Sequence, residues 1–262
     1  MNISGMALVG QIENRTTFIV VHDNKLKEEQ HAGLLTIEGQ EAPRYTPLEW
    51  VGNDIPVDLE AISSVPGDAS TFVALSSAGR VYHVSLDHQR KQVQVIQSFD
   101  VPTIPAGSDF EGISLQVVDH QLLLVWAERG LDAKPATLFW SKFDLQNHTC
   151  SHVGFAAIKV PYPTAYVRHI SDVKVDPTGS VFISAAADPG DNGPFNSAVY
   201  YIGVFGVTDG QRLTFKQATT KTRLYCFSYH KVEAMEFVPG VNGGVAFGSD
   251  DENLGASVNL GW

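Results

Sequence analysis

Five short segments of the chain begin alike, and three of them carry a glutamate at the same place. The segments are Ser4–Leu8, Glu60–Ser64, Glu111–Leu115, Ser171–Val175 and Glu233–Phe237. If five copies of one unit form a ring, their first side chains converge on its axis. Carboxylate and hydroxyl oxygens are ligands that suit Ca²⁺, which accepts six to eight of them in flexible geometry. The sequence therefore predicts one axial calcium ion held by Ser4, Glu60, Glu111, Ser171 and Glu233.

A divalent cation would also resolve a conflict between the three glutamates. Carboxylates that lie close together without a partner repel one another and raise one another's pKa. Zinc is not expected, because the set contains neither cysteine nor histidine. Two alternatives stay open: the glutamates are solvated ladder residues, or the ion only pins the units together.

The segments begin 51 to 62 residues apart, so the unit that positions them is a repeat of this size. Runs rich in Val, Ile, Phe, Tyr and Leu recur between turn residues, and helical periodicity is scarce. Eight runs are predicted strands: 17–22, 71–75, 81–86, 92–99, 122–126, 137–143, 181–185 and 199–205. Several strands in each repeat indicate the blade of a β-propeller. We expect an all-β, five-bladed β-propeller in a single domain, with mostly four-stranded blades at 3–55, 56–106, 107–167, 168–229 and 230–262.

The fifth blade is expected to be incomplete. Strands are predicted at Val232–Val238, Gly244–Gly248 and Ala256–Leu260, and no fourth strand is evident. An unfinished blade would leave a strand edge that a partner might cover.

Composition limits the classes of partner. The net charge of −11 is not offset by any basic stretch, so neither nucleic acid nor a membrane is an expected partner. No apolar run is long enough to span a membrane. No signal peptide is visible, so the cytoplasm is the default location, with a mature secreted chain as the alternative. Cys150 and Cys226 are expected to be free thiols.

Loops between second and third strands should reach the same face as the glutamates. Asp23 and Glu128 are the candidate general bases there, and Arg129 is the candidate clamp for an anionic group. His22 and His169 are candidate proton carriers, although a lone histidine at a strand end is more often structural. The face is thus expected to bind a small anionic ligand or a partner protein.

The series Ser, Glu, Glu, Ser, Glu resembles the calcium-activated nucleotidases, or apyrases, and more distantly the esterase-like phytase propellers. The match lies on Ser4, Glu60, Glu111, Ser171 and Glu233, and Lys231–Phe237 is the nearest local likeness. The resemblance implies a five-bladed propeller with an axial calcium ion. The family's aspartate after the first serine is replaced by Gly5, which removes one ligand. The family's nucleotide-binding residues have no counterpart that can be placed on this sequence.

Two functions follow from these patterns. The first is a calcium-binding propeller that binds a ligand or partner without catalysis, and the sequence favours it slightly because basic residues near the mouth are sparse. The alternative is a calcium-dependent hydrolase of phosphate esters or anhydrides, similar to the nucleotidases. The fold alone does not decide between them.

Overall fold

Short β-branched and aromatic runs separated by turn residues give this chain its strands. The computed structural model describes residues 2–240 and 243–261. Within these ranges it contains nineteen strands and one 3-10 helix, η1 (Glu252–Leu254). Seven of the eight predicted runs lie within strands, and the run 17–22 extends one residue beyond the end of its strand at Val21. The predicted all-β propeller is confirmed. None of the helical structure in this part of the chain is long or apolar enough to cross a membrane.

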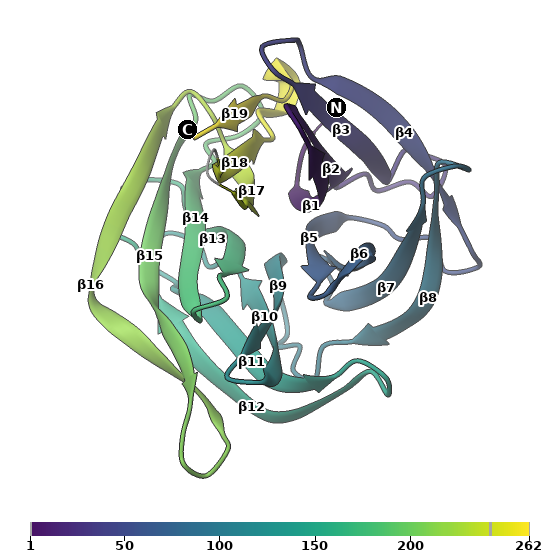
Figure 1. The fold of residues 1–262 in the computed structure, drawn as a ribbon. Coiled ribbons are helices and arrows are strands. Elements are labelled where there is room, and N and C mark those ends of the chain that lie inside the picture. The colour runs from purple at the N-terminus through teal and green to yellow at the C-terminus, as the bar shows by residue number, and fades with distance from the viewer. Residues whose placement is uncertain (1, 241–242, 262) are drawn as a thin grey trace.

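Five antiparallel units follow one another around a common axis (Figure 1). Blade 1 has β1 (Gly5–Ile12), β2 (Arg15–Val21), β3 (Ala32–Glu38) and β4 (Arg44–Val51). Blade 2 has β5 (Leu59–Val65), β6 (Asp68–Ser76), β7 (Arg80–Asp87) and β8 (Gln92–Asp100). Blade 3 has β9 (Phe110–Val118), β10 (Gln121–Glu128), β11 (Ala136–Asp144) and β12 (Thr149–Ile158). Blade 4 has β13 (Val167–Val175), β14 (Ser180–Ala187), β15 (Asn196–Val207) and β16 (Leu213–Ser228).

Blade 5 has three strands in the described residues, β17 (Val232–Val238), β18 (Gly244–Ser249) and β19 (Val258–Leu260). Its incompleteness matches the sequence-based prediction. The predicted blade limits fall in the segments between blades, except that β13 begins one residue before the limit at 167/168. Cys150 and Cys226 are free, as expected.

An unexpected contact joins the first two blades. Their outermost strands, β4 and β8, pair in parallel, with Trp50 opposite Val93. Blades 1 and 2 therefore form one continuous sheet of eight strands, visible where β4 meets β8 in Figure 1. This pairing covers two edges that would otherwise be open for pairing with another chain.

The innermost strands crowd one another at the axis, which explains the glycine or alanine that follows Ser4 and each of the three glutamates. A Cβ atom added at Gly5 would lie 2.7 Å from the Cα atom of Ala61 in the next blade. One added at Gly112 would lie 2.8 Å from a methyl carbon of Val173. Neither position has room for a side chain, so glycine is required by close backbone approach.

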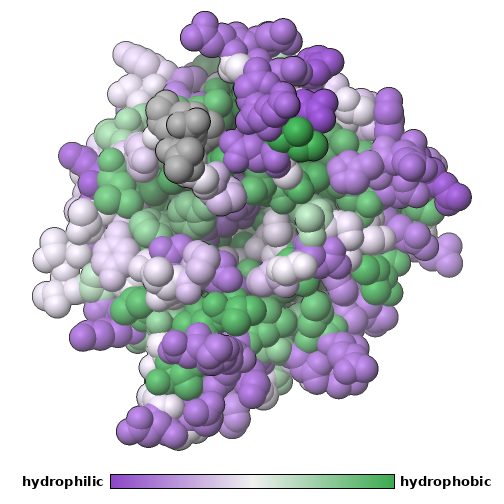
Figure 2. Space-filling view, viewed as in Figure 1, coloured by the Kyte–Doolittle hydropathy of each residue, from purple (hydrophilic) through white to green (hydrophobic). Residues whose placement is uncertain are grey.

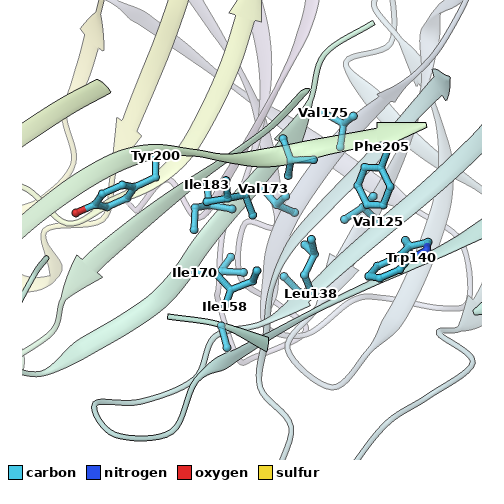
Figure 3. Packing of buried hydrophobic residues seen from close by; sticks show 14 of the residues in the cluster. Val125, Leu138, Trp140, Ile158, Ile170, Val173, Val175, Ile183, Tyr200 and Phe205 are labelled. Atoms are coloured by element: carbon cyan, nitrogen blue, oxygen red, sulfur yellow. The ribbon is translucent and has the colours of Figure 1, made fainter. Parts of the chain in front are cut away.

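Apolar side chains fill the spaces between neighbouring blades. Figure 3 shows one such layer, in which Leu138 and Trp140 of blade 3 face Val173 and Ile183 of blade 4. The ring closes in the same way, since Met6 and Phe18 of blade 1 pack with Val238 of blade 5. On the face seen in Figure 2, apolar residues surround the axis and polar residues gather toward the rim.

A single buried lysine ties the inner strands together. The Nζ atom of Lys174 donates to the carbonyl oxygens of Met6 in blade 1 (2.9 Å) and Ile62 in blade 2 (2.8 Å). It also lies 3.5 Å from a carboxylate oxygen of Glu236 in blade 5 and 4.0 Å from Asp172 on its own strand. Lys174 thus links its own strand, β13, to one inner strand in each of three other blades at the centre of the ring.

We expect Lys174→Met to destabilise the protein by about 3–5 kcal/mol, because it leaves the buried carboxylates of Asp172 and Glu236 without their cation. Urea unfolding at pH 7 measures this loss. Lys142→Met, on the exposed side of β11, is the matched control and should change stability by no more than about 0.5 kcal/mol. Equal stability of the two variants would show that Lys174 does not hold the ring together.

Candidate active site

A polar cavity opens where the inner strands begin. Its volume is about 480 Å³, and ten acidic and four basic side chains line it. The lining comes from all five blades, and Glu60, Glu111 and Glu233 are among it. Three acids that lie far apart in sequence therefore share one cavity on the axis.

A β-bulge turns each of these glutamates toward the axis. The pairing of β5 with β6 skips Glu60, the pairing of β9 with β10 skips Glu111, and that of β17 with β18 skips Glu233. An unpaired extra residue bends its strand and re-aims its side chain, and such bulges are enriched beside active sites. The repeat seen in the sequence is thus a repeat of backbone irregularity as well as of residue type.

Protein cations neutralise one side of the cavity. Arg168 lies 3.0 Å from Glu233 and 3.4 Å from Glu111, and it also pairs with Asp188. Burial alone would raise the pKa of Asp188, but the charges of Arg168 and Lys231 and the hydrogen bond from the Gly190 amide together lower that pKa. The buried Arg168 in turn has a raised pKa, since the surrounding carboxylates overcome its loss of solvation.

Two further cations complete this side. Arg129 lies 2.9 Å from Asp109 and 3.1 Å from Glu111. Lys231 lies 3.4 Å from Glu233 and 3.2 Å from Asp250. The cations of blades 3, 4 and 5 are therefore all engaged by carboxylates of the same three blades.

The side formed by blades 1 and 2 is different, and we call Asp23, Asp58 and Glu60 the acidic side. The cation nearest to it is Lys25, which is largely exposed and lies 3.8 Å from Asp58. Glu60 makes no hydrogen bond or ion pair with the described residues. Burial, followed by the charges of Glu111 and Glu233, raises the pKa of Glu60 well above its ordinary value. Glu60 is thus the axial glutamate that lacks a cation partner within the described chain.

The two serines of the predicted site do not join the glutamates. Ser4 and Ser171 are buried, and neither lines the cavity. Ser4 lies just before Gly5, the first residue of β1 that pairs with β2. Ser171 lies in a wider irregularity between Arg168 and Asp172.

The candidate catalytic residues are divided in the same way. Asp23 and Arg129 line the cavity, whereas Glu128 does not and instead pairs with Lys134 at 2.7 Å.

The two candidate histidines are held in structural hydrogen bonds. His22 Nδ1 contacts the carbonyl oxygen of Asn2, and its Nε2 lies 2.9 Å from the Tyr45 hydroxyl. His169 Nε2 lies 2.8 Å from the carbonyl oxygen of Asp132. Burial lowers the pKa of both rings, and neither lines the cavity. The structural alternative therefore describes them better than the role of proton carrier.

The side chains as they lie do not fit the predicted calcium ligands. Arg168 stands between Glu111 and Glu233, so a cation of the protein occupies the place between two of the three glutamates. The part of the chain that the structure describes holds no group of three or more His, Cys, Asp or Glu side chains arranged to bind a metal. We therefore derive no chemical step through a metal ion.

Two acids of the cavity were missed from sequence. Asp58 precedes Glu60 by two residues, and Asp109 precedes Glu111 by two. Each acid lies immediately before an inner strand, Asp58 before β5 and Asp109 before β9. The pattern Asp-x-Glu at equivalent places in blades 2 and 3 is the signal that would have revealed them.

Solved structures of several glycoside hydrolases have a fold similar to that of this chain. A GH43 endo-arabinanase from Bacillus licheniformis has a TM-score of 0.52 and 10% identity, over 97% of this chain and 92% of that one. An exo-1,5-α-L-arabinanase from a bovine ruminal metagenomic library has a TM-score of 0.55 and 11% identity, over 99% and 92%. An exo-β-1,3-galactanase from Clostridium thermocellum has a TM-score of 0.51 and 8% identity, over 96% and 55%.

These likenesses establish the propeller fold and give no support to the expected kinship with calcium-activated nucleotidases. No protein-family model and no curated protein sequence matches the chain. At such low identity the neighbours show how the chain folds, so the role of the cavity has to be argued from its own side chains.

The raised pKa of Glu60 makes stability depend on pH in a defined direction. The folded chain keeps a proton that the unfolded chain releases above about pH 4.5, so stability falls as pH rises toward the folded pKa. One such proton changes the free energy of unfolding by at most about 1.4 kcal/mol per pH unit. Glu60→Gln does not titrate, and we expect it to gain stability relative to the native chain between pH 5 and pH 8. Urea unfolding in the presence of EDTA measures this, and a constant difference would contradict it.

Proposed function

We propose that the chain hydrolyses glycosidic bonds in the axial cavity. The observation that carries this proposal is Glu60, a carboxyl group recessed on the axis with no cation partner, facing further carboxylates across one open space. Structural neighbours whose names describe enzymes acting on arabinan and galactan support it, because they share the propeller fold.

Cleavage of a glycosidic bond uses two carboxyl groups in different protonation states. One donates a proton to the leaving oxygen, and the other activates water or attacks the sugar. Environments that push two carboxyl pKa values apart identify such a pair. Burial and neighbouring acids raise the pKa of Glu60, which favours its protonated form and the role of general acid. The pKa of Glu233 is raised as well, but Glu233 is paired with Arg168 and Lys231.

Asp23 supplies the second carboxyl group. It lines the same cavity and is near enough to Glu60 to contribute to the rise in its pKa. Its one side-chain hydrogen bond in the described structure is a long contact with Asn2, at 3.3 Å. Asp58 is held more firmly, by the hydroxyl of Ser77 at 2.5 Å and by Lys25. Asp23 is therefore the freer of the two to take a proton from water.

The cations of the cavity favour a neutral substrate over a phosphate. Each of Lys25, Arg129, Arg168 and Lys231 already has a carboxylate within 4.0 Å. Arg129, expected to clamp an anion, is committed to Asp109 and Glu111. A phosphate would have to displace these partners amid an excess of negative charge, whereas sugar hydroxyls can both donate to carboxylates and accept from the guanidinium groups.

The proposal predicts that Glu60→Gln lowers turnover of polysaccharide by about 10²–10⁴-fold, the usual contribution of a general acid. Dinitrophenyl glycosides should lose far less, because their leaving group departs without a proton. Reducing-sugar release from arabinan and β-1,3-galactan, and absorbance with the aryl glycosides, measure the two cases. Glu41→Gln, in the exposed turn after β3, is the control for a lost carboxylate. The role of Glu60 is refuted if both substrate types lose activity equally, and the hydrolase proposal fails if the native chain cleaves none of them.

Calcium binding is the second proposal, and the excess of ten acids over four bases around the cavity favours it. If the cavity binds calcium, a concentration 100 times the dissociation constant adds about 2.7 kcal/mol of stability. Thermal unfolding with CaCl₂, with MgCl₂ and with EDTA measures the gain, and Asp58→Asn should reduce it. A melting temperature that is the same in all three solutions would exclude calcium in this cavity, and hydrolysis that persists in EDTA would separate any ion from the reaction.

A further inference from the structure

Two exposed tyrosines stand beside the cavity in an unusual backbone conformation. Tyr166 is 57% exposed and has φ of 53°, and Tyr229 is 72% exposed and has φ of 69°. The other non-glycine residues with positive φ in the described chain are all polar or charged. A bulky residue at positive φ is an outlier that costs of order 1–3 kcal/mol and tends to mark a functional position.

The backbone around both tyrosines is held, while their side chains are free. The carbonyl oxygen of Tyr166 accepts a hydrogen bond from the amide of Asp188 (2.9 Å), and the amide of Tyr229 donates to Phe195 (2.7 Å). Neither phenol hydroxyl makes a hydrogen bond with the residues that the structure describes. The fold thus fixes where the rings emerge and leaves their faces open to solvent.

Both tyrosines are placed next to the cavity by their neighbours in sequence. Tyr166 precedes Arg168 by two residues, and Tyr229 precedes Lys231 by two, and both cations line the cavity. Asp188, bonded to the backbone of Tyr166, lines it as well. The tyrosines therefore mark the rim of blades 4 and 5, opposite the acidic side that carries Glu60.

Two exposed leucines extend this rim. Leu131 is 53% exposed, and the amide that follows it, on Asp132, bonds to Val167 next to Tyr166. Leu254 is 65% exposed, in a turn that the pair Asp251–His230 fastens beside Tyr229. Exposed apolar side chains gathered beside a polar cavity indicate a surface that binds a ligand.

We propose that Tyr166 and Tyr229 form a sugar-binding platform outside the cavity, so that the substrate is a chain of several sugars that crosses blades 4 and 5. This inference rests on the proposed glycosidase function for its substrate class. A pyranose or furanose ring has an apolar face of C–H groups and a rim of hydroxyls. An aromatic side chain with an open face and a polar tip matches both features. Sugars beyond the cleaved bond then lie on the tyrosines while the bond itself reaches Glu60.

The strained backbone provides a test that a purely structural role would fail. Asparagine tolerates positive φ better than tyrosine does. We expect Tyr166→Asn and Tyr229→Asn to be at least as stable as the native chain in urea, yet to bind the polymer more weakly. For arabinan or β-1,3-galactan we expect KM to rise at least five-fold with kcat unchanged, and activity on 4-nitrophenyl monosaccharides to stay the same. Phe155→Asn, a 72% exposed aromatic on the outer strand β12, is the control and should change none of these.

Direct binding separates this inference from the proposed function. The same polymers are measured by affinity electrophoresis in a Glu60→Gln background, where no turnover is required. If substitution of either tyrosine abolishes this binding while the native chain hydrolyses none of the polymers, the platform is supported and the glycosidase is refuted. Hydrolysis with polymer KM unchanged in both tyrosine variants overturns the platform alone. A tyrosine variant that loses stability along with polymer binding, or a native chain that binds none of the polymers, also overturns it.

Discussion

The five innermost strands converge on one axis and bring charged side chains together there, away from water. The free-energy cost of burying these charges determines how they are paired, both along the axis and at the cavity. A buried charge is tolerated only when it is paired and hydrogen-bonded. Along the axis, Lys174 satisfies carbonyl oxygens of two blades and faces the carboxylates of Asp172 and Glu236. At the cavity end, Arg168 pairs with Glu111 of blade 3 and Glu233 of blade 5, and Lys231 also pairs with Glu233. The protein thus supplies from its own chain much of the positive charge that a metal ion would bring.

The cations that compensate the buried carboxylates are distributed unevenly around the cavity, and this gives the carboxyl groups different environments. Blades 3 to 5 contribute three cations to the cavity, and each is within reach of more than one carboxylate. Blades 1 and 2 contribute acids with only the exposed Lys25 nearby. Burial and the charges of Glu111 and Glu233 raise the pKa of Glu60, whereas Arg168 and Lys231 help to lower that of Asp188 against the effect of burial. Burial also raises the pKa of Glu233, but Glu233 pairs with Arg168 and Lys231, and Glu60 has no such partner in the described chain. Carboxyl groups in different environments within one cavity are what acid–base catalysis requires.

A feature of this structure could be predicted from the sequence where a local pattern determines it, and could not where contacts between distant segments do. Apolar runs between turn residues predicted the strands, and the spacing of the glutamates predicted the ring. Both are local patterns that are repeated along the chain. The lining of the cavity was not predictable in full, so Ser4 and Ser171 were grouped with the glutamates although neither serine lines it. Hydropathy also cannot tell that Lys174 is buried while Lys142 is exposed, since the difference lies in which strands from other blades surround each. The parallel pairing of β4 with β8 joins strands of two separate blades and leaves no local signal.

The shape and charge of the cavity limit the class of ligand more than the fold does. Neighbours at 8–12% identity share the propeller with this chain, but so small a fraction of common residues cannot transfer a mechanism. The cavity itself argues against a phosphate, because its cations are committed and its net charge is negative. Tyr166 and Tyr229 are exposed at its rim although their positive φ angles strain the backbone. Their exposure there favours a substrate that is longer than the cavity. A neutral, extended molecule with both hydroxyl groups and apolar faces satisfies all of these constraints, and a chain of sugars has that chemistry.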